Sequence, residues 1–462
     1  SNNYSTVTLK ANGEVWSYGY NGYGQLGTGD TQNKILPTYT NINNIMQIAL
    51  GKNHTVAVDK DGHVFTWGYN SYGQLGNGTN KTQMLPVKMI DKDKNVVKNI
   101  KDIAAGYNFN LAVDSNGYVY SWGYNGYGQL GDNSTVSRSI PTRIEGLEKI
   151  KNVYSYGNTS MAINENGEIY VWGYGYNKVP TKLDFYSKAV DIHGKLILAE
   201  DGSVWTLSLN PTKIAGLSNI VEVASGDNYY AALDTKGRVW VLGYNRYGQL
   251  SQANTSDVDT LTFVKVQKET EYEVLQDIVE LKAGKNSLQM ISSNGDLYVS
   301  GYSSYGQLGT GENKSSITIA TKAKNMDNTK FVDSNSYHSI ASDNNGFVYT
   351  AGYNGYGELG DGTYTSTNEF NVIGDTYVHV EKNKVTIEEG KTKQIKASLD
   401  NKFNLIKDTV DSGNISYKSL NDEIATVDAN GTIHAKKLGT VEIIATHTIT
   451  HKVAVIFVQV VP

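Results

Sequence analysis

The side chains that could carry chemistry are few. Of the eight histidines, His54 and His338 share one place in a recurring segment, which indicates a structural residue that bonds a neighbouring loop. Asp59 and Asp61 precede Gly62 as turn residues do, and no EF-hand register follows them. The absence of cysteine excludes disulfides, thiolate metal sites and cysteine nucleophiles. Without a serine elbow, phosphate loop or dinucleotide fingerprint, we expect no enzyme, no catalytic residue, no metal site and no cofactor.

Tyrosine is abundant, at 33 residues, and in six segments two tyrosines lie three positions apart. The first of each pair is a candidate ligand-binding residue, because exposed aromatic side chains on one rim could stack on sugars or form protein hot spots. These candidates are Tyr20, Tyr69, Tyr124, Tyr244, Tyr302 and Tyr353. The second set is Tyr23, Tyr72, Tyr127, Tyr247, Tyr305 and Tyr356. The alternative interpretation is that both sets pack against neighbouring loops and hold them together.

These tyrosines belong to an internal repeat with eight copies. The residues that mark the copies are Gly19, Gly68, Gly123, Gly173, Ser208, Gly243, Gly301 and Gly352. Their spacings are 49, 55, 50, 35, 35, 58 and 51 residues. Each copy has a pair such as Asp61-Gly62 between two alternating apolar runs, which predicts a β-hairpin. The second hairpin strand is apolar on both faces, as at Val64 and Phe65, so it should lie between neighbouring sheets.

Two further strands are expected in most copies. One contains or follows a proline, such as Pro37, Pro86 or Pro141, and should be the outer edge strand because proline has no N–H to donate. The other ends in small residues, as in Ile103–Gly106, and should lie near the axis. The first copy lacks this inner strand, because the chain starts at its hairpin.

The pattern Val-x-x-Trp-Gly-x-Asn-x-x-Gly-Gln-Leu-Gly, then Pro, Ile-Ala-x-Gly and His-x-x-Ala-Val, resembles the regulator of chromosome condensation repeat. The resemblance covers residues 1–375, is clearest in Asn70–Gly76 and Asn125–Gly131, and is weak in the two 35-residue copies around Trp172 and Trp205. It implies an all-β fold with a β-propeller of seven or eight blades, and the repeat count favours eight.

Residues 376–462 lack the repeat and contain short alternating strands separated by glycine turns at Gly390, Gly431 and Gly439. This pattern predicts a small immunoglobulin-like β-sandwich. The run Tyr417–Ala435, with the following Leu-Gly-Thr-Val, resembles the bacterial immunoglobulin-like domain. That family occurs in surface adhesins and wall proteins, so the resemblance implies an extracellular or cell-surface location. The lack of cysteine favours an exported protein of a Gram-positive bacterium.

A net charge of −5 argues against a nucleic-acid partner. The longest apolar run, Val453–Val458, is too short for membrane insertion. We therefore expect a monomeric, non-catalytic, extracellular bacterial interaction module that binds a protein or a cell-surface glycan through its propeller loops. Two alternatives stay open. The chain is the targeting region of a larger cell-wall hydrolase, or it is an effector that exchanges nucleotide on a small GTPase, as the resemblance to the repeat family implies.

Overall fold

A computed structural model describes residues 4–373, 376–401, 413–448 and 453–462. They divide into two compact units, Ser1–Ala341 with Thr350–Phe370, and Ser342–Tyr349 with Asn371–Pro462. All regular elements of the described residues are β-strands, which confirms the predicted all-β class. None of these residues lies in a helix long and apolar enough to span a membrane. The domain boundary expected after residue 375 stays a prediction.

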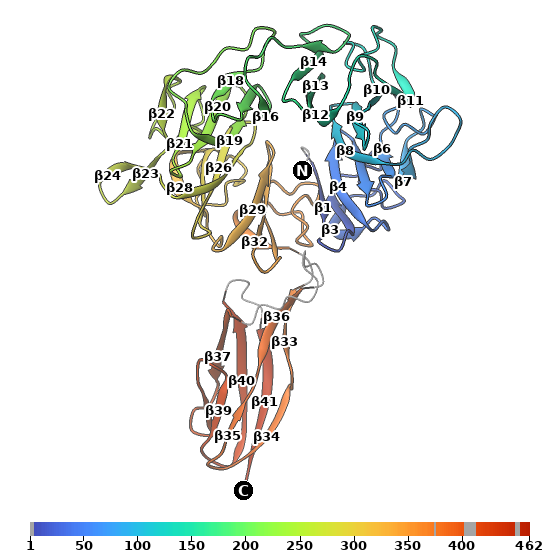
Figure 1. Cartoon of the computed structure of the whole chain (residues 1–462). Coiled ribbons are helices and arrows are strands. Elements are labelled where there is room, and N and C mark those ends of the chain that lie inside the picture. The colour runs from blue at the N-terminus through green and yellow to red at the C-terminus, as the bar shows by residue number, and fades with distance from the viewer. Residues whose placement is uncertain (1–3, 374–375, 402–412, 449–452) are drawn as a thin grey trace. The chain divides into compact units, whose positions relative to one another are not determined.

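Eight small sheets follow one another along residues 5–372, around a common centre (Figure 1). The first three consist of β1 (Ser5–Leu9), β2 (Val15–Gly19) and β3 (Lys34–Tyr39); β4 (Ile45–Leu50), β5 (His54–Asp59), β6 (Val64–Gly68) and β7 (Gln83–Lys88); and β8 (Ile100–Ala105), β9 (Phe109–Asp114), β10 (Val119–Gly123) and β11 (Arg138–Arg143). Strands that neighbour each other in these sheets run antiparallel.

The next three sheets consist of β12 (Ile150–Tyr156), β13 (Thr159–Asn164), β14 (Ile169–Gly173) and β15 (Thr181–Lys182); β16 (Ala189–His193), β17 (Leu196–Ala199) and β18 (Val204–Thr206); and β19 (Ile220–Ser225), β20 (Tyr229–Asp234), β21 (Val239–Gly243) and β22 (Val258–Phe263). The seventh consists of β25 (Ile278–Ala283), β26 (Ser287–Ser292), β27 (Leu297–Tyr302) and β28 (Ser316–Lys322), extended by β23 (Lys265–Lys268) and β24 (Glu271–Val274). The eighth consists of β29 (Thr329–Ser334), β30 (His338–Asp343), β31 (Val348–Gly352) and β32 (Thr367–Val372).

The strand order within the sheets confirms the placement expected from the sequence. The proline-containing strands β3, β7 and β11 are edge strands, and the strands ending in small residues, such as β8, form the opposite edge, towards the centre (Figure 1). The first sheet has three strands because no strand precedes β1 in it. The sheet count equals the number of repeat copies, while the number of blades stays a prediction.

The core of the first unit lies between adjacent sheets. One cluster joins Val56 and Val64 of the second sheet to Ile100, Ala112 and Trp122 of the third. Because these side chains come from two successive copies, each sheet needs its neighbour to bury its apolar surface.

The hairpin turns lie where the sequence predicts them, although only the glycine of each pair, and not both residues as a type I′ turn would need, has a positive φ. The Oδ1 atom of Asp59 accepts hydrogen bonds from the backbone N–H groups of Asp61 and His63, at 3.0 and 2.8 Å. Gly62 between them has a φ of +74°, which favours glycine. The Asp59, Asp61 and His63 side chains converge within 4.8 Å. However, Asp59 Oδ2 lies 3.0 Å from His63 Nδ1, so both carboxylate oxygens of Asp59 already take part in the turn.

Hydrogen bonds between successive copies join the sheets. In three copies a fully buried indole N–H donates to the backbone carbonyl of a glutamine in the preceding copy. These bonds join Trp67 to Gln25 at 2.9 Å, Trp122 to Gln74 at 3.0 Å, and Trp172 to Gln129 at 2.9 Å. Each bond satisfies a buried donor and fixes one loop on the next sheet.

The buried histidines act in the same way, which confirms their predicted structural role. His54 Nε2 lies 2.8 Å from Asn110 Oδ1 of the next copy, and burial lowers the pKa of His54 to about 4. His338 Nε2 lies 2.8 Å from Thr6 Oγ1, which joins the eighth sheet to the first. The Thr6 hydroxyl also lies 3.3 Å from the carbonyl oxygen of Glu358.

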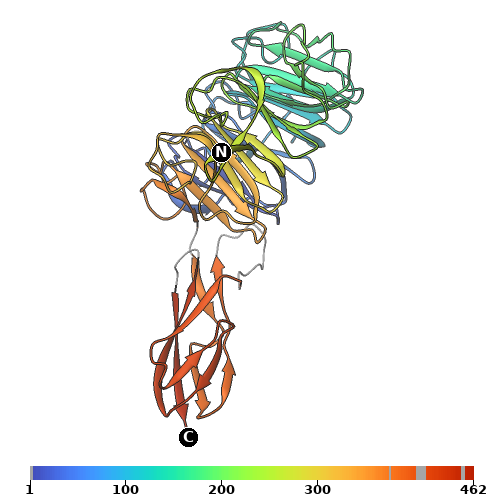
Figure 2. The same cartoon turned by 90° about the vertical axis from the view of Figure 1, so that its left-hand side faces the viewer.

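The second unit is a β-sandwich, as predicted. Its larger sheet has the order β34 (Lys384–Glu388), β41 (Val453–Val461), β40 (Gly439–His447) and β37 (Ile415–Ser419). The smaller sheet has the order β35 (Thr392–Gln394), β39 (Thr432–Ala435) and β38 (Ala425–Val427), and β33 (Thr376–Val380) pairs with β36 (Ala397–Asn401). The strands run along the length of the unit (Figure 2). Buried Ile387, Ile433, Ile443 and Ile456 belong to its core.

Glu358 generates a testable prediction, because it stands where other copies have glutamine. Its side chain is fully buried, Oε2 accepts a hydrogen bond from the Tyr356 N–H at 2.8 Å, and Oε1 has no partner among the described residues. Burial raises the pKa of Glu358 to about 7. Because the folded protein holds this proton more tightly than the unfolded chain does, Glu358 destabilises the fold where it must ionise. Its contribution to the free energy of unfolding is therefore most favourable at low pH and decreases as the pH rises from the ordinary value of 4.5 to about 7.

We therefore expect E358Q to raise the free energy of unfolding by about 1–2 kcal/mol at pH 8 and to change it little at pH 5. Urea unfolding of the full chain at both pH values measures this. Gln74→Glu at the matching position is the control, and it should lose stability at pH 8. An equal effect of E358Q at both pH values would contradict the assignment.

Candidate functional site

The loops that carry the tyrosine pairs are held by two buried polar side chains. In the second copy, Asn70 Oδ1 accepts a hydrogen bond from the Leu75 N–H at 2.9 Å, and Asn70 Nδ2 donates to the carbonyl of Lys81 at 2.9 Å. Gln74 Oε1 accepts a hydrogen bond from the Tyr72 N–H at 3.0 Å. The repeated Asn and Gln residues therefore fix the loop conformation.

The strand-end glycine positions the first tyrosine. Gly68 has a φ of +100°, and a Cβ atom there would lie 2.6 Å from the carbonyl oxygen of Asn53. That same carbonyl accepts the Tyr69 N–H at 2.9 Å. A side chain at position 68 would therefore displace the turn that holds Tyr69 in place.

Eleven tyrosines of the two sets and Tyr174 interleave into one continuous series of ring contacts, which we call the tyrosine row. Each ring meets the next edge to face, at interplanar angles between 61° and 81°. Centroids are 6.1–6.3 Å apart within a loop and 4.9–5.3 Å apart between loops. The row runs in the order Tyr247, Tyr302, Tyr305, Tyr353, Tyr356, Tyr20, Tyr23, Tyr69, Tyr72, Tyr124, Tyr127 and Tyr174.

Five of the six candidate ligand-binding tyrosines lie in this row, and all five are half-buried. Tyr244 is exposed, has no contact to another aromatic ring among the described residues, and lies under the guanidinium of Arg246 at 5.0 Å. The second set is more exposed, with Tyr23 at 39% and Tyr72 and Tyr305 at 38%. Packing between loops and an exposed aromatic surface, the two alternatives that the sequence left open, are therefore compatible. The rings contact neighbouring loops and remain partly accessible to solvent. Ligand binding by the first set stays a prediction.

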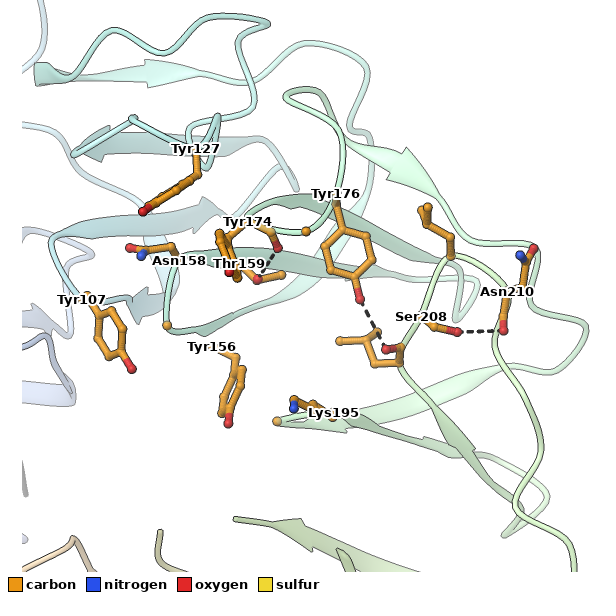
Figure 3. Close-up of a pocket in the computed structure, with 15 residues that line it drawn as sticks. Tyr107, Tyr127, Tyr156, Asn158, Thr159, Tyr174, Tyr176, Lys195, Ser208 and Asn210 are labelled. Atoms are coloured by element: carbon orange, nitrogen blue, oxygen red, sulfur yellow. Dashed lines mark hydrogen bonds between the residues drawn. The ribbon is translucent and has the colours of Figure 1, made fainter. Parts of the chain in front are cut away.

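The tyrosine row is interrupted between Tyr174 and Tyr247, where the two short copies lack the Gln-Leu-Gly loop. A pocket of about 840 Å³ opens there (Figure 3). Five tyrosines contribute to its lining, namely Tyr107, Tyr127, Tyr156, Tyr174 and Tyr176. The signal for this pocket in the sequence is the 35-residue spacing of the copies.

Comparison with protein families agrees with this architecture. Residues 1–183 match the RCC1-like domain, residues 220–249 match the regulator of chromosome condensation (RCC1) repeat, and residues 376–457 match the bacterial Ig-like domain (group 2). The chain carries an RCC1-like propeller followed by a bacterial Ig-like domain. Both resemblances inferred from the sequence are thereby confirmed.

Relatives of the RCC1-like propeller occur in otherwise different proteins. The ultraviolet-B receptor UVR8 of Arabidopsis thaliana is 28% identical over 266 residues, which cover 56% of this chain and 54% of the receptor. The probable E3 ubiquitin-protein ligase HERC6 of Homo sapiens is 32% identical over 258 residues, which cover 54% of this chain and 24% of the ligase. The chain therefore spans about half or less of these curated relatives.

Solved structures support the propeller fold. Yeast RCC1 (Prp20), in its crystal structure with Kap60, is 21% identical, with 79% of this chain and 85% of that chain covered and a TM-score of 0.56. Human WBSCR16 is 18% identical, with 79% of this chain and 96% of that chain covered and a TM-score of 0.55. At these identities the likeness shows the fold alone.

The tyrosine row should contribute to stability as well as to the surface. Tyr69 contacts Tyr23 at 5.2 Å and Tyr72 at 6.2 Å. Because an edge-to-face pair contributes about 0.5–1.5 kcal/mol, we expect Y69A to lower the free energy of unfolding by about 1–3 kcal/mol. Y69F should leave it unchanged, as should Tyr186→Ala, since Tyr186 is 85% exposed. Urea unfolding measures the three variants, and equal values for Y69A and Y186A would show that the row does not hold the loops.

Proposed function

We propose that this chain is a non-catalytic interaction module of the bacterial cell surface, which binds a protein partner through the loop face of its RCC1-like propeller. The tyrosine row carries this proposal. It gathers twelve aromatic side chains on loops at one end of successive sheets, and their exposed edges and hydroxyl groups form a broad amphipathic surface. Tyrosine is enriched among the residues that dominate protein–protein binding energy.

The contact geometry favours a protein over a glycan at the row itself. Each edge-to-face contact in the row places the edge of one ring against the face of its neighbour, so the row offers fewer free ring faces for a sugar than separate tyrosines would. Ring edges and hydroxyls remain, and these suit hydrogen bonding and packing across an extended interface. The solved yeast relative is bound to another protein, Kap60, which agrees with a protein partner.

A non-catalytic role is supported by the uses that the polar residues already have. His54 and His338 are buried and hydrogen-bonded to the adjoining copy, and Asp59 holds its own hairpin turn. A cell-surface location is supported by the bacterial Ig-like domain at residues 376–457. No observation on the described residues favours the wall-hydrolase or the nucleotide-exchange alternative.

The test compares two triple variants of the full chain on an array of cell-surface proteins and glycans. Y23A/Y72A/Y305A removes three exposed rings of the row, and Y186A/Y272A/Y364A removes three exposed tyrosines outside it. We expect saturable binding to a protein target by the wild type and the control, and at least tenfold weaker binding by the row variant, because hot-spot aromatics typically contribute about 2 kcal/mol or more each. Undiminished binding by the row variant would contradict the proposal, and loss in the control as well would indicate a general folding defect.

A further inference from the structure

The pocket in the gap of the tyrosine row differs from the row in both shape and chemistry. In the third copy, residues 124–137 connect β10 to β11. In the fourth copy, the corresponding connection between β14 and β15 spans only residues 174–180. In the fifth copy the loop after β18 returns within a few residues, where the Thr206 N–H bonds the carbonyl of Thr212 at 2.9 Å. The two shortened loops leave the ends of the inner strands uncovered.

Two tyrosines on these inner turns have ring faces that no other ring covers. Tyr107 follows β8 and Tyr156 ends β12, and their exposed fractions are 56% and 38%. The two turns are joined by a hydrogen bond from the Tyr107 N–H to the carbonyl of Gly157 at 3.0 Å. Neither ring stacks on another aromatic ring among the described residues. No aromatic ring in the described part of the chain therefore competes with a ligand for their faces, as neighbouring rings do within the tyrosine row.

Hydrogen-bonding groups surround these two rings. Figure 3 shows Tyr107, Tyr156 and Lys195 along one side of the pocket, with Asn158 on the neighbouring turn. Asn158 Oδ1 accepts a hydrogen bond from Gln129 Nε2 at 3.3 Å, which orients the amide and leaves its Nδ2 group as a donor. The Tyr176 hydroxyl, in contrast, donates to the carbonyl of Leu207 at 3.3 Å and so braces the pocket wall.

The charge of the pocket favours an anionic ligand. Lys195 is the one charged residue that lines the pocket among the described residues, and no carboxylate lines it. Its Nζ lies 3.4 Å from Asn228 Oδ1, a neutral partner. Burial and the nearby charge of Asp227 raise the pKa of Tyr156, but Asp227 Oδ2 is paired with Lys285 Nζ at 3.5 Å. The charge of Lys195 is therefore not neutralised by a carboxylate among the residues that line the pocket.

We propose that this pocket binds an oligosaccharide that carries a carboxylate. Pyranose rings would lie on the faces of Tyr107 and Tyr156, since the C–H groups of a sugar face carry partial positive charge and an aromatic face is negative. Asn158 donates to a sugar hydroxyl, and Lys195 pairs with the sugar carboxylate. A volume of about 840 Å³ accommodates a short oligosaccharide segment. The pocket shares Tyr127 and Tyr174 with the end of the tyrosine row, but the residues argued to bind the sugar lie outside the row, so either proposal can fail alone.

The experiment measures binding of the full chain to paired oligosaccharides by titration calorimetry and on an array. One pair is a sialylated host-type glycan and its desialylated form, and the other is a muramic-acid-containing wall fragment and a chitooligosaccharide of equal length. We expect the acidic member of one pair to bind at least fivefold more tightly than its neutral counterpart. The pair that binds identifies the source of the glycan.

Two pocket variants and one control make the test specific. Y107A/Y156A should weaken binding at least tenfold, whereas K195M should abolish the preference for the acidic member and retain neutral binding. Y186A/Y272A, with two exposed tyrosines outside the pocket, should bind as the wild type does. Circular dichroism and thermal melting check that all variants fold.

Three results would overturn the proposal. They are no binding of either glycan pair by the wild type, equal binding by the wild type and Y107A/Y156A, or loss of a protein target alone in Y107A/Y156A. The last result would make the pocket part of the protein interface. The proposed function is judged separately, by Y23A/Y72A/Y305A, whose residues do not line the pocket.

Discussion

The hydrogen bond from one side chain to the loop carbonyl of the preceding copy is the constraint on which the propeller surface depends. Its donor is present in four of the copies that follow such a loop, whereas the eighth copy, which also follows one, has Ala351 at the tryptophan position. Trp67, Trp122 and Trp172 each follow a copy with a Gln-Leu-Gly loop, whereas the two copies that follow loop-less ones have Leu207 and Leu242 at the same position. The sixth copy has the Gln-Leu-Gly loop again, and in the seventh copy the Ser300 hydroxyl donates to the carbonyl of Gln249 at 3.0 Å.

This constraint explains why the loop face has two kinds of surface. Where a loop is bonded to the next sheet, its two tyrosines reach the loops on either side, and the rings form the tyrosine row. Where the loop is absent, the inner turns are uncovered, and Tyr107 and Tyr156 present open faces beside Lys195. A broad interface and a pocket therefore arise from one repeat by the presence or absence of a single loop.

Much of the fold could be predicted from the sequence because its signals are local. Pairs such as Asp61-Gly62 determine turns, and Pro37 or Pro86 determines an edge strand, whatever surrounds them. Exposure of the tyrosines could not be predicted, because Tyr69 and Tyr72 belong to one loop and differ only in how neighbouring loops cover them. The pocket was missed for a related reason. Its lining comes from three copies, and it results from absent residues, which no motif records.

The most direct test of this account is amide hydrogen exchange of the full chain with and without the substitution Trp122→Phe. Phenylalanine keeps the apolar packing and removes the indole N–H that bonds Gln74, at 3.0 Å. The account predicts faster exchange in residues 69–76, whose loop keeps only the bond that Asn110 Nδ2 donates to the same carbonyl at 2.8 Å. It predicts unchanged exchange in residues 20–27, whose loop is bonded by Trp67 instead. Unchanged exchange in residues 69–76 would contradict the claim that this bond positions the loops and the tyrosines they carry.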